Sequence, residues 1–356
     1  MKTINLDLGS KSYDIIIQTG LLKNIGAEIN KFYNNKKISI VTDSNVYNIY
    51  GSIIKASLEH YKYNINFIIV SPGEKSKSLE VLTCCYNDLI KHGITRSDLI
   101  IALGGGVIGD LAGFAAATYL RGINYVQIPT SLLAQIDSSI GGKVAVNLEQ
   151  GKNLIGNFYQ PYKVFIDPDV LNTLPDKYIK DGLGEVIKYA CIKDPNLFEI
   201  LMNIKSKDQL FNNIEYIIYT CCNIKKIIVE KDEHDNGERM LLNFGHTLGH
   251  AIEKYFNYEY SHGEAVSKGM YYITKKSEEL QITEPGTAEE IKNILINFNI
   301  EYDIPNLDMD NIKGTIKLDK KNMSDKINLI LIKKIGDAFI ESISMDHINK
   351  YFGETI

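Results

Sequence analysis

Three of the seven histidines lie close together in the second half of the chain. His246, His250 and His262 fall within 17 residues, and the first two are four residues apart, so on a helix they share one face. Two imidazoles at this spacing converge on one point, an arrangement that is frequent in zinc sites. The spacing favours His246 and His250 as the ligand pair of a metal site. It leaves the completing carboxylate open among Glu185, Glu253 and Glu264.

A glycine-rich turn has the pattern of a nucleotide-binding loop. Residues 104–109 read GGGVIG, which satisfies G-x-G-x-x-G, between an apolar run and a segment of small helix formers. Glycines there let backbone N–H groups approach a pyrophosphate at a helix N-terminus. No acidic residue follows the next strand to hold a ribose, and the nearest candidate is Asp43. The turn therefore indicates either a variant dinucleotide site or a structural strand-to-helix turn.

Residues 71–78, SPGEKSKS, also stand between a strand-like run and a helical one. Glu74 and Lys77 are placed to face a ribose and a phosphate there, and the alternative is a solvated polar loop. Cations also stand beside glycine and asparagine through the middle of the chain, a sensible way to clamp phosphate and carboxylate groups. For each one the alternative is solvated surface, but as a set they predict a multiply anionic substrate. They are Arg121, Lys143, Lys152, Lys188, Lys225 and Arg239.

Two kinds of segment must position these groups. In the first half, apolar runs typical of strands (37–43, 64–70, 98–103, 125–129 and 164–167) alternate with helical segments (78–92 and 110–120), and residues 1–20 alternate like a half-buried strand pair. After Pro175 helical spacing dominates to about residue 297, and a hairpin follows at 327–343. We predict an α/β domain with a doubly wound parallel sheet over residues 1–175 and a mostly α-helical domain over residues 176–356.

Composition narrows the class of protein. The chain has 356 residues, 44% apolar and 23% charged, which is ordinary for a soluble globular protein. A net charge of −5 makes a nucleic-acid binder improbable, since such proteins depend on a basic surface. No apolar run is long enough for a membrane span, and residues 1–20 lack the apolar core of a signal peptide. The five cysteines form no disulfide or zinc pattern, so we expect a reduced, cytoplasmic protein.

Six segments together resemble the 3-dehydroquinate synthase family of sugar phosphate cyclases. They are GGGVIGDLAGFAAATYLRG, QIPTSLLAQIDSSIGGKVAVN, GKNLIGNFYQP, GEVIKYA, KDEHDNGERMLLNFGHTLGHAIE and HGEAVSKGM, in that order. Weaker similarity reaches both ends, including LDKKN at 318–322. The resemblance implies a Rossmann-like N-terminal domain, a helical C-terminal domain, a tightly held NAD, one divalent metal (zinc or cobalt) and a homodimer.

The resemblance also implies an activity, that of a carbon–oxygen lyase acting on phosphates. The reaction converts 3-deoxy-D-arabino-heptulosonate 7-phosphate to 3-dehydroquinate and phosphate, in the shikimate pathway to aromatic amino acids. Two other enzyme classes share the architecture: a sugar phosphate cyclase acting on another sugar phosphate, and a metal-dependent polyol dehydrogenase. No nucleic-acid or membrane partner is expected.

The family's site residues are carried over position by position. The metal ligands implied are Glu185, His246 and His262. This set replaces the pair His246 and His250 that the spacing favoured, and it implies that His250 is a substrate or proton-transfer residue. Contacts to NAD are implied for Asp43, Pro72, Gly73, Glu74, Lys75, Ser76, Lys77, Gly106, Val107, Ile108, Gly109, Asp110, Thr130, Ser131, Lys143, Lys152, Val170, Leu171, Asn172 and Thr173. Substrate contacts are implied for Arg121, Asp137, Lys143, Asn153, Lys188, Lys225, Arg239, Asn243, His250 and one of Lys320 and Lys321.

The chain departs from the family pattern at two places. Ser131 stands where a second threonine is usual and keeps the hydroxyl, whereas Val144-Ala145 replaces a usual Thr-Gly and removes a hydroxyl. Neither departure removes a catalytic group, so the sequence predicts an active enzyme.

Overall fold

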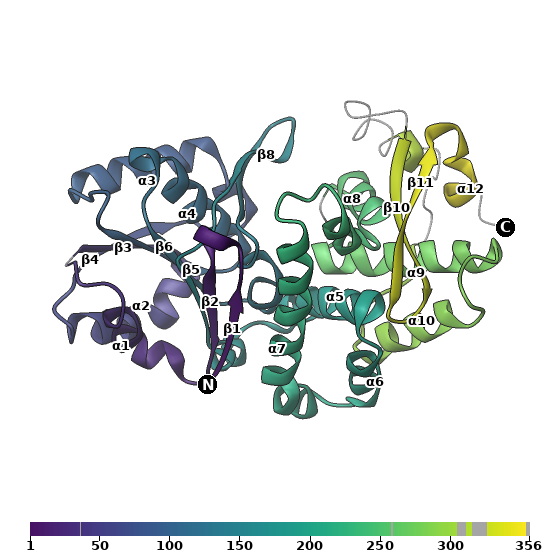
Figure 1. Cartoon of the computed structure of the whole chain (residues 1–356), viewed down its shortest axis with the longest axis horizontal. Helices are drawn as coiled ribbons and strands as arrows, with labels where there is room; N and C mark the ends of the chain where they lie inside the picture. The colour runs from purple at the N-terminus through teal and green to yellow at the C-terminus, as the bar shows by residue number, and fades with distance from the viewer. Residues whose placement is uncertain (36, 258, 305–310, 315–325, 354–356) are drawn as a thin grey trace. The chain divides into compact units, whose positions relative to one another are not determined.

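The computed structural model describes residues 1–356 except 36, 258, 305–310, 315–325 and 354–356 (Figure 1). The chain forms two compact units, Met1–Pro175 with Ile214–Glu233 and Asp176–Asn213 with His234–Ile356. The first unit therefore takes up the second part of helix α7 (Lys207–Lys231) in addition to residues 1–175. Burial explains this, because Ile217, Ile218 and Cys222 are fully buried and the Cys222 thiol lies 3.4 Å from the Gln135 carbonyl oxygen.

A seven-stranded sheet forms the centre of the first unit, in the order β1-β2-β9-β6-β5-β3-β4. The first two strands pair antiparallel, as the alternation of residues 1–20 predicted, and all other neighbours are parallel. The bounds are Lys2–Leu6 (β1), Tyr13–Ile17 (β2), Lys37–Asp43 (β3), Asn64–Val70 (β4), Leu99–Gly104 (β5), Tyr125–Pro129 (β6) and Lys163–Ile166 (β9). The parallel strands follow the doubly wound order in which connections reverse between β3 and β5, where such folds bind ligands at the carboxyl ends.

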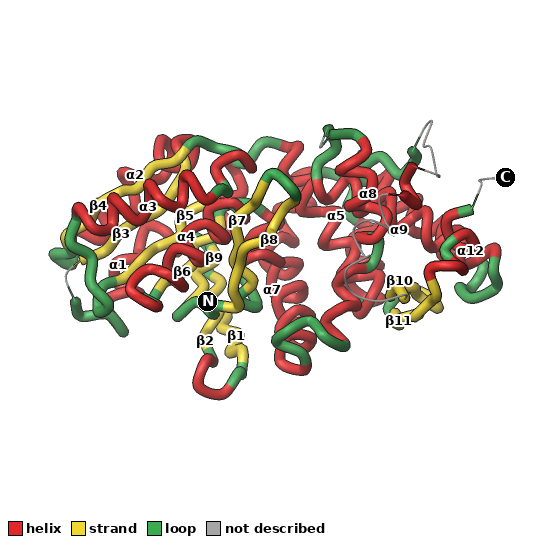
Figure 2. The backbone as a smooth tube through the Cα atoms, turned by 90° about the horizontal axis from the view of Figure 1, so that it is seen from above, coloured by secondary structure: helices red, strands yellow, loops and turns green. Residues whose placement is uncertain are grey.

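Helices cover both faces of this sheet, as the strand pattern requires. Alternate residues of β5 belong to two apolar cores, with Ile101 and Leu103 in one and Ile100 and Ala102 in the other. Helices α1 (Ile25–Asn30) and α2 (Ser44–Glu59) pack on the first core, and α3 (Leu79–Lys91) and α4 (Gly106–Thr118) pack on the second. The predicted α/β domain is confirmed (Figure 2).

An antiparallel hairpin in the same unit was not predicted. Strands β7 (Lys143–Leu148) and β8 (Gly151–Phe158) form a separate two-stranded sheet. Glycine, lysine and asparagine are frequent in this stretch, and glycine and asparagine are uncommon in strands, so its sequence lacks a strand signature. The hairpin carries Lys143, Lys152 and Asn153.

The second unit is mostly helical, as predicted. Its helices are α5 (Asp176–Lys193), α6 (Pro195–Asn203), the start of α7, α8 (His246–Tyr255), α9 (His262–Glu279), α10 (Thr287–Asn297) and α12 (Asn349–Phe352). The predicted hairpin is present as β10 (Lys326–Lys334) and β11 (Asp337–Ser344). All five cysteines are free thiols. Within the described ranges, no helix has the length and apolar character needed to cross a membrane.

Candidate functional site

Three helices of the second unit bring the predicted metal ligands together. Glu185 lies in the middle of α5, while His246 and His262 are the first residues of α8 and α9. The Oε1 atom of Glu185 lies 3.5 Å from His246 Nε2 and 3.7 Å from His262 Nε2. The nitrogens of His246, His250 and His262 lie within 4.8 Å of one another, so both pairings considered from the sequence meet in one cluster.

Glycines allow the three helices to approach closely. A Cβ on Gly184 of α5 would lie 2.5 Å from the Gly263 carbonyl oxygen, and a Cβ on Gly263 would lie 1.9 Å from the Asp181 carbonyl oxygen. Gly269 of α9 meets the backbone before α8 in the same way, since its Cβ would lie 2.1 Å from the Gly245 carbonyl oxygen. Glu185 directly follows Gly184, and His246 directly follows Gly245. The close backbone contact at these glycines therefore brings the Glu185 and His246 side chains together.

The donor set fits a divalent metal. Glu185 is 1% exposed, and its Oε1 has no hydrogen-bond partner among the described residues although it faces two imidazoles. Burying a carboxylate oxygen without a hydrogen bond is costly, so this atom is placed for a cation. Burial, aided by the positive charge of Lys188, holds the pKa of His246 well below its usual value, which keeps the imidazole neutral as ligation requires. One carboxylate oxygen and two imidazoles suit zinc or cobalt.

The other two candidate carboxylates have different partners. Glu253 is 5% exposed, and its Oε2 lies 3.2 Å from His262 Nδ1, the ring nitrogen other than the one that faces Glu185. Burial lowers the pKa of His262, but the hydrogen bond to Glu253 and the charge of Glu185 outweigh it and raise the pKa to about 8. Glu264 accepts a hydrogen bond from the Ser261 backbone N–H at 2.9 Å in a capping box that begins α9.

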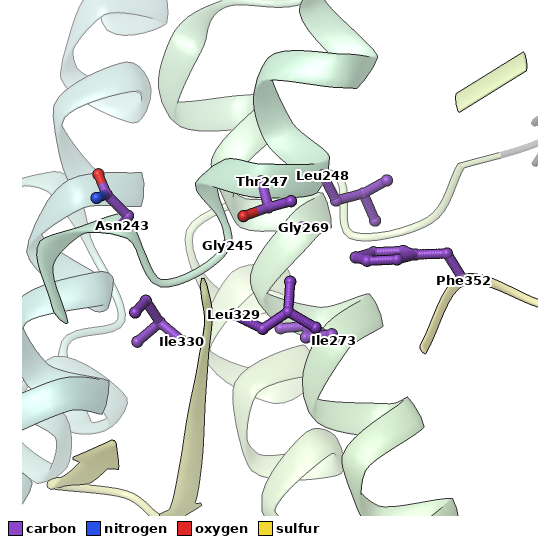
Figure 3. A pocket seen from close by; sticks show the side chains of 9 residues that line it. All are labelled: Asn243, Gly245, Thr247, Leu248, Gly269, Ile273, Leu329, Ile330 and Phe352. Carbon is purple, nitrogen blue, oxygen red and sulfur yellow. The ribbon is translucent and has the colours of Figure 1, made fainter. Parts of the chain in front are cut away.

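The second unit also carries four of the predicted substrate residues, of which Lys188 and His250 contact this cluster. Lys188 is buried and pairs with Glu185 Oε2, and Arg239 is 2% exposed. His250 is exposed on α8, one helical turn after His246. Asn243 ends the short helix Glu238–Asn243 and borders a small cavity, of about 10 Å³. Figure 3 shows this cavity between Asn243 and Phe352, with apolar side chains along it. It has room for about one water, so it is no substrate pocket.

The predicted NAD residues gather at one edge of the sheet of the first unit. Except for Lys143 and Lys152 on the hairpin, they lie at the carboxyl ends of five parallel strands: Asp43 at the end of β3, 72–77 after β4, 106–110 after β5, 130–131 after β6 and 170–173 after β9. The glycine turn starts α4 next to the point where the connections reverse, between β3 and β5. The α4 N-terminus therefore points its backbone N–H groups at the place where doubly wound folds bind phosphates.

Several of these residues also have structural roles. Asp43 caps α2 by accepting hydrogen bonds from the Asn45 and Val46 backbone N–H groups, at 2.9 and 3.1 Å. A Cβ on Gly105 would lie 3.3 Å from Ser131 Oγ, and one on Gly106 would lie 3.0 Å from Ser138 Oγ. Val144 is 2% exposed and packs against Gly113 of α4, so this departure from the family pattern lies in the core.

Lys77 links the cofactor residues to the hairpin β7–β8. Its ammonium group, on a side chain 6% exposed, contacts both Asp110 Oδ2 and Asn153 Oδ1. Burial raises the pKa of Asp110 to about 6, and the charge of Lys77 opposes this rise. Nearby, Lys225 of α7 donates to Asp137, at 2.6 Å to the carbonyl oxygen and 2.9 Å to Oδ1.

Arg121 lies at the other end of α4 from the glycine turn. It follows the carboxyl end of α4, a helix of 13 residues and so about 20 Å long, whose first residue is in the glycine turn. It therefore lies towards the opposite edge of the sheet. Lys143 begins β7, and three residues of extended strand separate it from Asn147, which contacts Asn153. Lys320 and Lys321 lie outside the described residues.

Comparisons with known proteins agree along the whole chain. The family model described as 3-dehydroquinate synthase N-terminal matches residues 67–181, and the one described as 3-dehydroquinate synthase C-terminal matches residues 182–322. A 3-dehydroquinate synthase of Clostridium acetobutylicum is 54% identical over 352 residues, which are 99% of each chain.

Two solved structures are similar in fold. A 2-deoxy-scyllo-inosose synthase, complexed with carbaglucose-6-phosphate, NAD+ and Co2+, has a TM-score of 0.88 and 25% identity over 100% of both chains. A 2-epi-5-epi-valiolone synthase from Streptomyces hygroscopicus, with NAD+ and Zn2+ bound, has a TM-score of 0.87 and 25% identity over 96% of both chains.

Proposed function

Since the chain belongs to the 3-dehydroquinate synthase family, we propose how its described residues carry out that family's reaction. The enzyme converts 3-deoxy-D-arabino-heptulosonate 7-phosphate, hereafter the heptulosonate, to 3-dehydroquinate and phosphate. It uses NAD and one divalent metal, as its similarity to structures with NAD+ and Co2+ or Zn2+ supports. The observation that carries the assignment of the metal site is the buried Glu185 Oε1, which has no hydrogen bond among the described residues and faces His246 and His262.

The reaction requires an oxidation that is later reversed. Phosphate leaves from carbon 7 of the heptulosonate, but the proton on carbon 6 is not acidic while carbon 5 carries a hydroxyl. Once carbon 5 is a ketone this proton becomes acidic, and β-elimination of phosphate follows. The chemistry that NAD and the metal supply when bound is reversible hydride acceptance at carbon 5 and polarisation of the carbon 4 and carbon 5 oxygens.

The second unit handles the oxygens and protons of the substrate. Glu185, His246 and His262 would hold the metal, and Glu253 fixes the His262 ring through Nδ1. His250 is exposed beside them and is placed to exchange the proton of the substrate hydroxyl. Lys188, Arg239 and Asn243 orient carboxylate and hydroxyl groups of the heptulosonate.

The first unit holds the cofactor and the phosphate. The glycine turn, Glu74 and Asp110 lie at the sheet edge where the pyrophosphate, ribose and nicotinamide of NAD bind. Asn153 of the hairpin binds phosphate, for which the family resemblance also implies Lys143 and Arg121, while Lys152 contacts NAD. The leaving phosphate takes the carbon 6 proton through its own oxygen. Lys225, fixed by Asp137, adds positive charge near this place. Ring opening and an aldol closure complete the sequence with little help beyond restraint of the substrate.

Phosphate release from different substrates tests the function. Purified enzyme with NAD and cobalt is expected to release phosphate from the heptulosonate without net formation of NADH. Release from sedoheptulose 7-phosphate or glucose 6-phosphate instead would identify another sugar phosphate cyclase. Net NADH formation on a polyol would identify a polyol dehydrogenase.

We further propose that the enzyme is a cytoplasmic homodimer. The family resemblance implies the dimer, and the free thiols of all five cysteines suit a reducing compartment. Light scattering at assay concentration measures the assembly directly, and a monomeric mass would contradict the dimer.

A further inference from the structure

One amide side chain in the first unit connects a cofactor residue to a substrate residue. Asn147 Nδ2 donates to Glu74 Oε1 at 2.7 Å, and Asn147 Oδ1 accepts from the Asn153 backbone N–H at 2.9 Å. We propose that Asn147 is a positioning residue that couples NAD binding at Glu74 to phosphate binding at Asn153. This inference rests on the proposed function, which places NAD at Glu74 and phosphate at Asn153.

Asn147 stands at an interruption of the β7–β8 ladder. Val146 pairs with Ile155 and Leu148 pairs with Gly151, so residues 152–154 of β8 face Asn147 alone. Such irregularities leave backbone groups without ladder partners and redirect side chains. The Asn147 backbone N–H donates to the Lys77 carbonyl oxygen at 2.8 Å instead of to β8. Its side-chain oxygen takes the Asn153 N–H, so Asn147 holds the bulge that presents Lys152 and Asn153.

The conformation of Asn153 requires such support. Its φ is +58°, in the left-handed region, which residues with a side chain adopt less readily than glycine. Asn153 is also exposed, so packing contributes little to its position. Two contacts fix it, the Asn147 oxygen at its backbone N–H and the Lys77 ammonium at its side-chain oxygen.

Only an amide satisfies both partners of Asn147. A carboxylate needs a donor and a backbone N–H needs an acceptor, and asparagine offers one of each on the same carbon. Glu74 is exposed, so its hydrogen bond to Asn147 orients the carboxylate where packing does not. A ribose bound at Glu74 therefore fixes Asn147 and, through it, the bulge. By linkage, phosphate bound at the bulge strengthens NAD binding by the same factor.

Calorimetric titration with inorganic phosphate tests this coupling in the full chain with its metal. The affinity is measured with and without NAD for the wild type, Asn147→Ala, Asn147→Asp and the control Asn157→Asp, an exposed asparagine elsewhere on β8. NAD is expected to tighten phosphate binding to the wild type and the control by about tenfold. In both Asn147 variants, NAD is expected to change the phosphate affinity by less than twofold.

A second measurement needs no variant. Amide hydrogen exchange in residues 147–158 of the wild type is expected to slow when NAD binds. Three results would each overturn the inference: exchange that NAD leaves unchanged, a wild type whose phosphate affinity does not depend on NAD, or Asn147 variants whose phosphate affinity still rises tenfold with NAD. None of these results would affect NAD-dependent turnover. A wild type that binds no NAD would contradict the proposed function itself, and the inference with it.

Discussion

At the residue scale, both imidazoles proposed as metal ligands direct one ring nitrogen towards Glu185 and the other towards a second protein group. His262 directs Nε2 towards Glu185 and Nδ1 towards Glu253, while His246 directs Nδ1 towards the Phe244 carbonyl oxygen at 3.1 Å. Such contacts set the tautomer and the ring orientation of a ligand. Glu253 is therefore a positioning residue although it lies outside the ligand set.

Replacing Glu253 should weaken metal binding. Glu253→Gln keeps an acceptor for Nδ1 but removes the charge, and Glu253→Ala removes both. We expect the cobalt affinity to fall about tenfold for the glutamine and up to about 100-fold for the alanine, since outer contacts of this kind contribute that much. Cobalt absorption spectra in a competition titration measure this. Glu290→Gln, an exposed change on α10, serves as the control and should leave the affinity unchanged, and equal affinities for all variants would contradict the role of Glu253.

Asp110 should give the NAD-free protein a distinct pH dependence. Burial raises its pKa from an ordinary value near 3.8 to about 6, so the folded state binds more protons than the unfolded chain between these values. The quantity to follow is the free energy of unfolding of the wild type minus that of Asp110→Asn. This difference should fall as pH rises from about 4 to about 6, by at most about 3 kcal/mol, and stay level above about 7. Urea unfolding of both proteins across this range is the measurement. A difference that grows with pH would contradict the assignment.

At the element scale, close backbone contact between α5 and α9 positions the metal ligands. Gly263 is the tightest point, and it is adjacent to His262. An alanine there would place its Cβ 1.9 Å from the Asp181 carbonyl oxygen and force the helices apart. The arrangement of the three ligands therefore depends on a residue that bears no side chain.

Gly263→Ala should lower both stability and metal content. Overpacking at a tight contact costs about 1–3 kcal/mol, and the displaced His262 should bind metal less well. Thermal unfolding and metal analysis of the purified protein measure the two effects. Gly314→Ala is the matched control, since nothing lies within 4 Å of its added methyl group, and it should change stability by less than about 0.5 kcal/mol. A Gly263 variant that matched this control in both measurements would refute the packing argument.

The sequence predicted the elements whose patterns are local. All five predicted parallel strands, two helices of the first unit and the late hairpin have clear periodicity, and all are present. The hairpin β7–β8 was missed because its strands are rich in residues that rarely form strands and are stabilised by contacts with Lys77 and α4. The placement of α7 residues 214–233 in the first unit depends on long-range burial, which no local pattern encodes.

The candidate site was predictable to a similar degree. Spacing identified the histidine cluster but favoured His250 over His262, since the approach of α9 to α8 is a tertiary contact. Glu253 follows His246 and His250 on one face of α8, so its spacing already indicates that it belongs to the cluster. Only the structure shows that it contacts His262 Nδ1 and not the proposed metal position. The role of Asn147 had no signal, because it depends on a ladder interruption.

At the scale of the whole molecule, the two kinds of chemistry reside in different units. The proposed NAD residues belong to Met1–Pro175, whereas the proposed metal ligands and the buried Lys188 and Arg239 belong to the second unit. The net charge of −5 is therefore compatible with the proposed role of local cations in binding an anionic substrate. It follows that removing the metal should abolish turnover without removing the means of binding NAD.

Metal removal with add-back tests the central claim most directly. The enzyme is treated with chelator, phosphate release from the heptulosonate is followed with NAD present, and cobalt or zinc is then returned in steps. We predict no release without metal, retained NAD affinity, and activity that recovers in proportion to metal up to one equivalent, with no NADH accumulating. Full phosphate release from metal-free protein, or NADH that accumulates with turnover, would contradict the account.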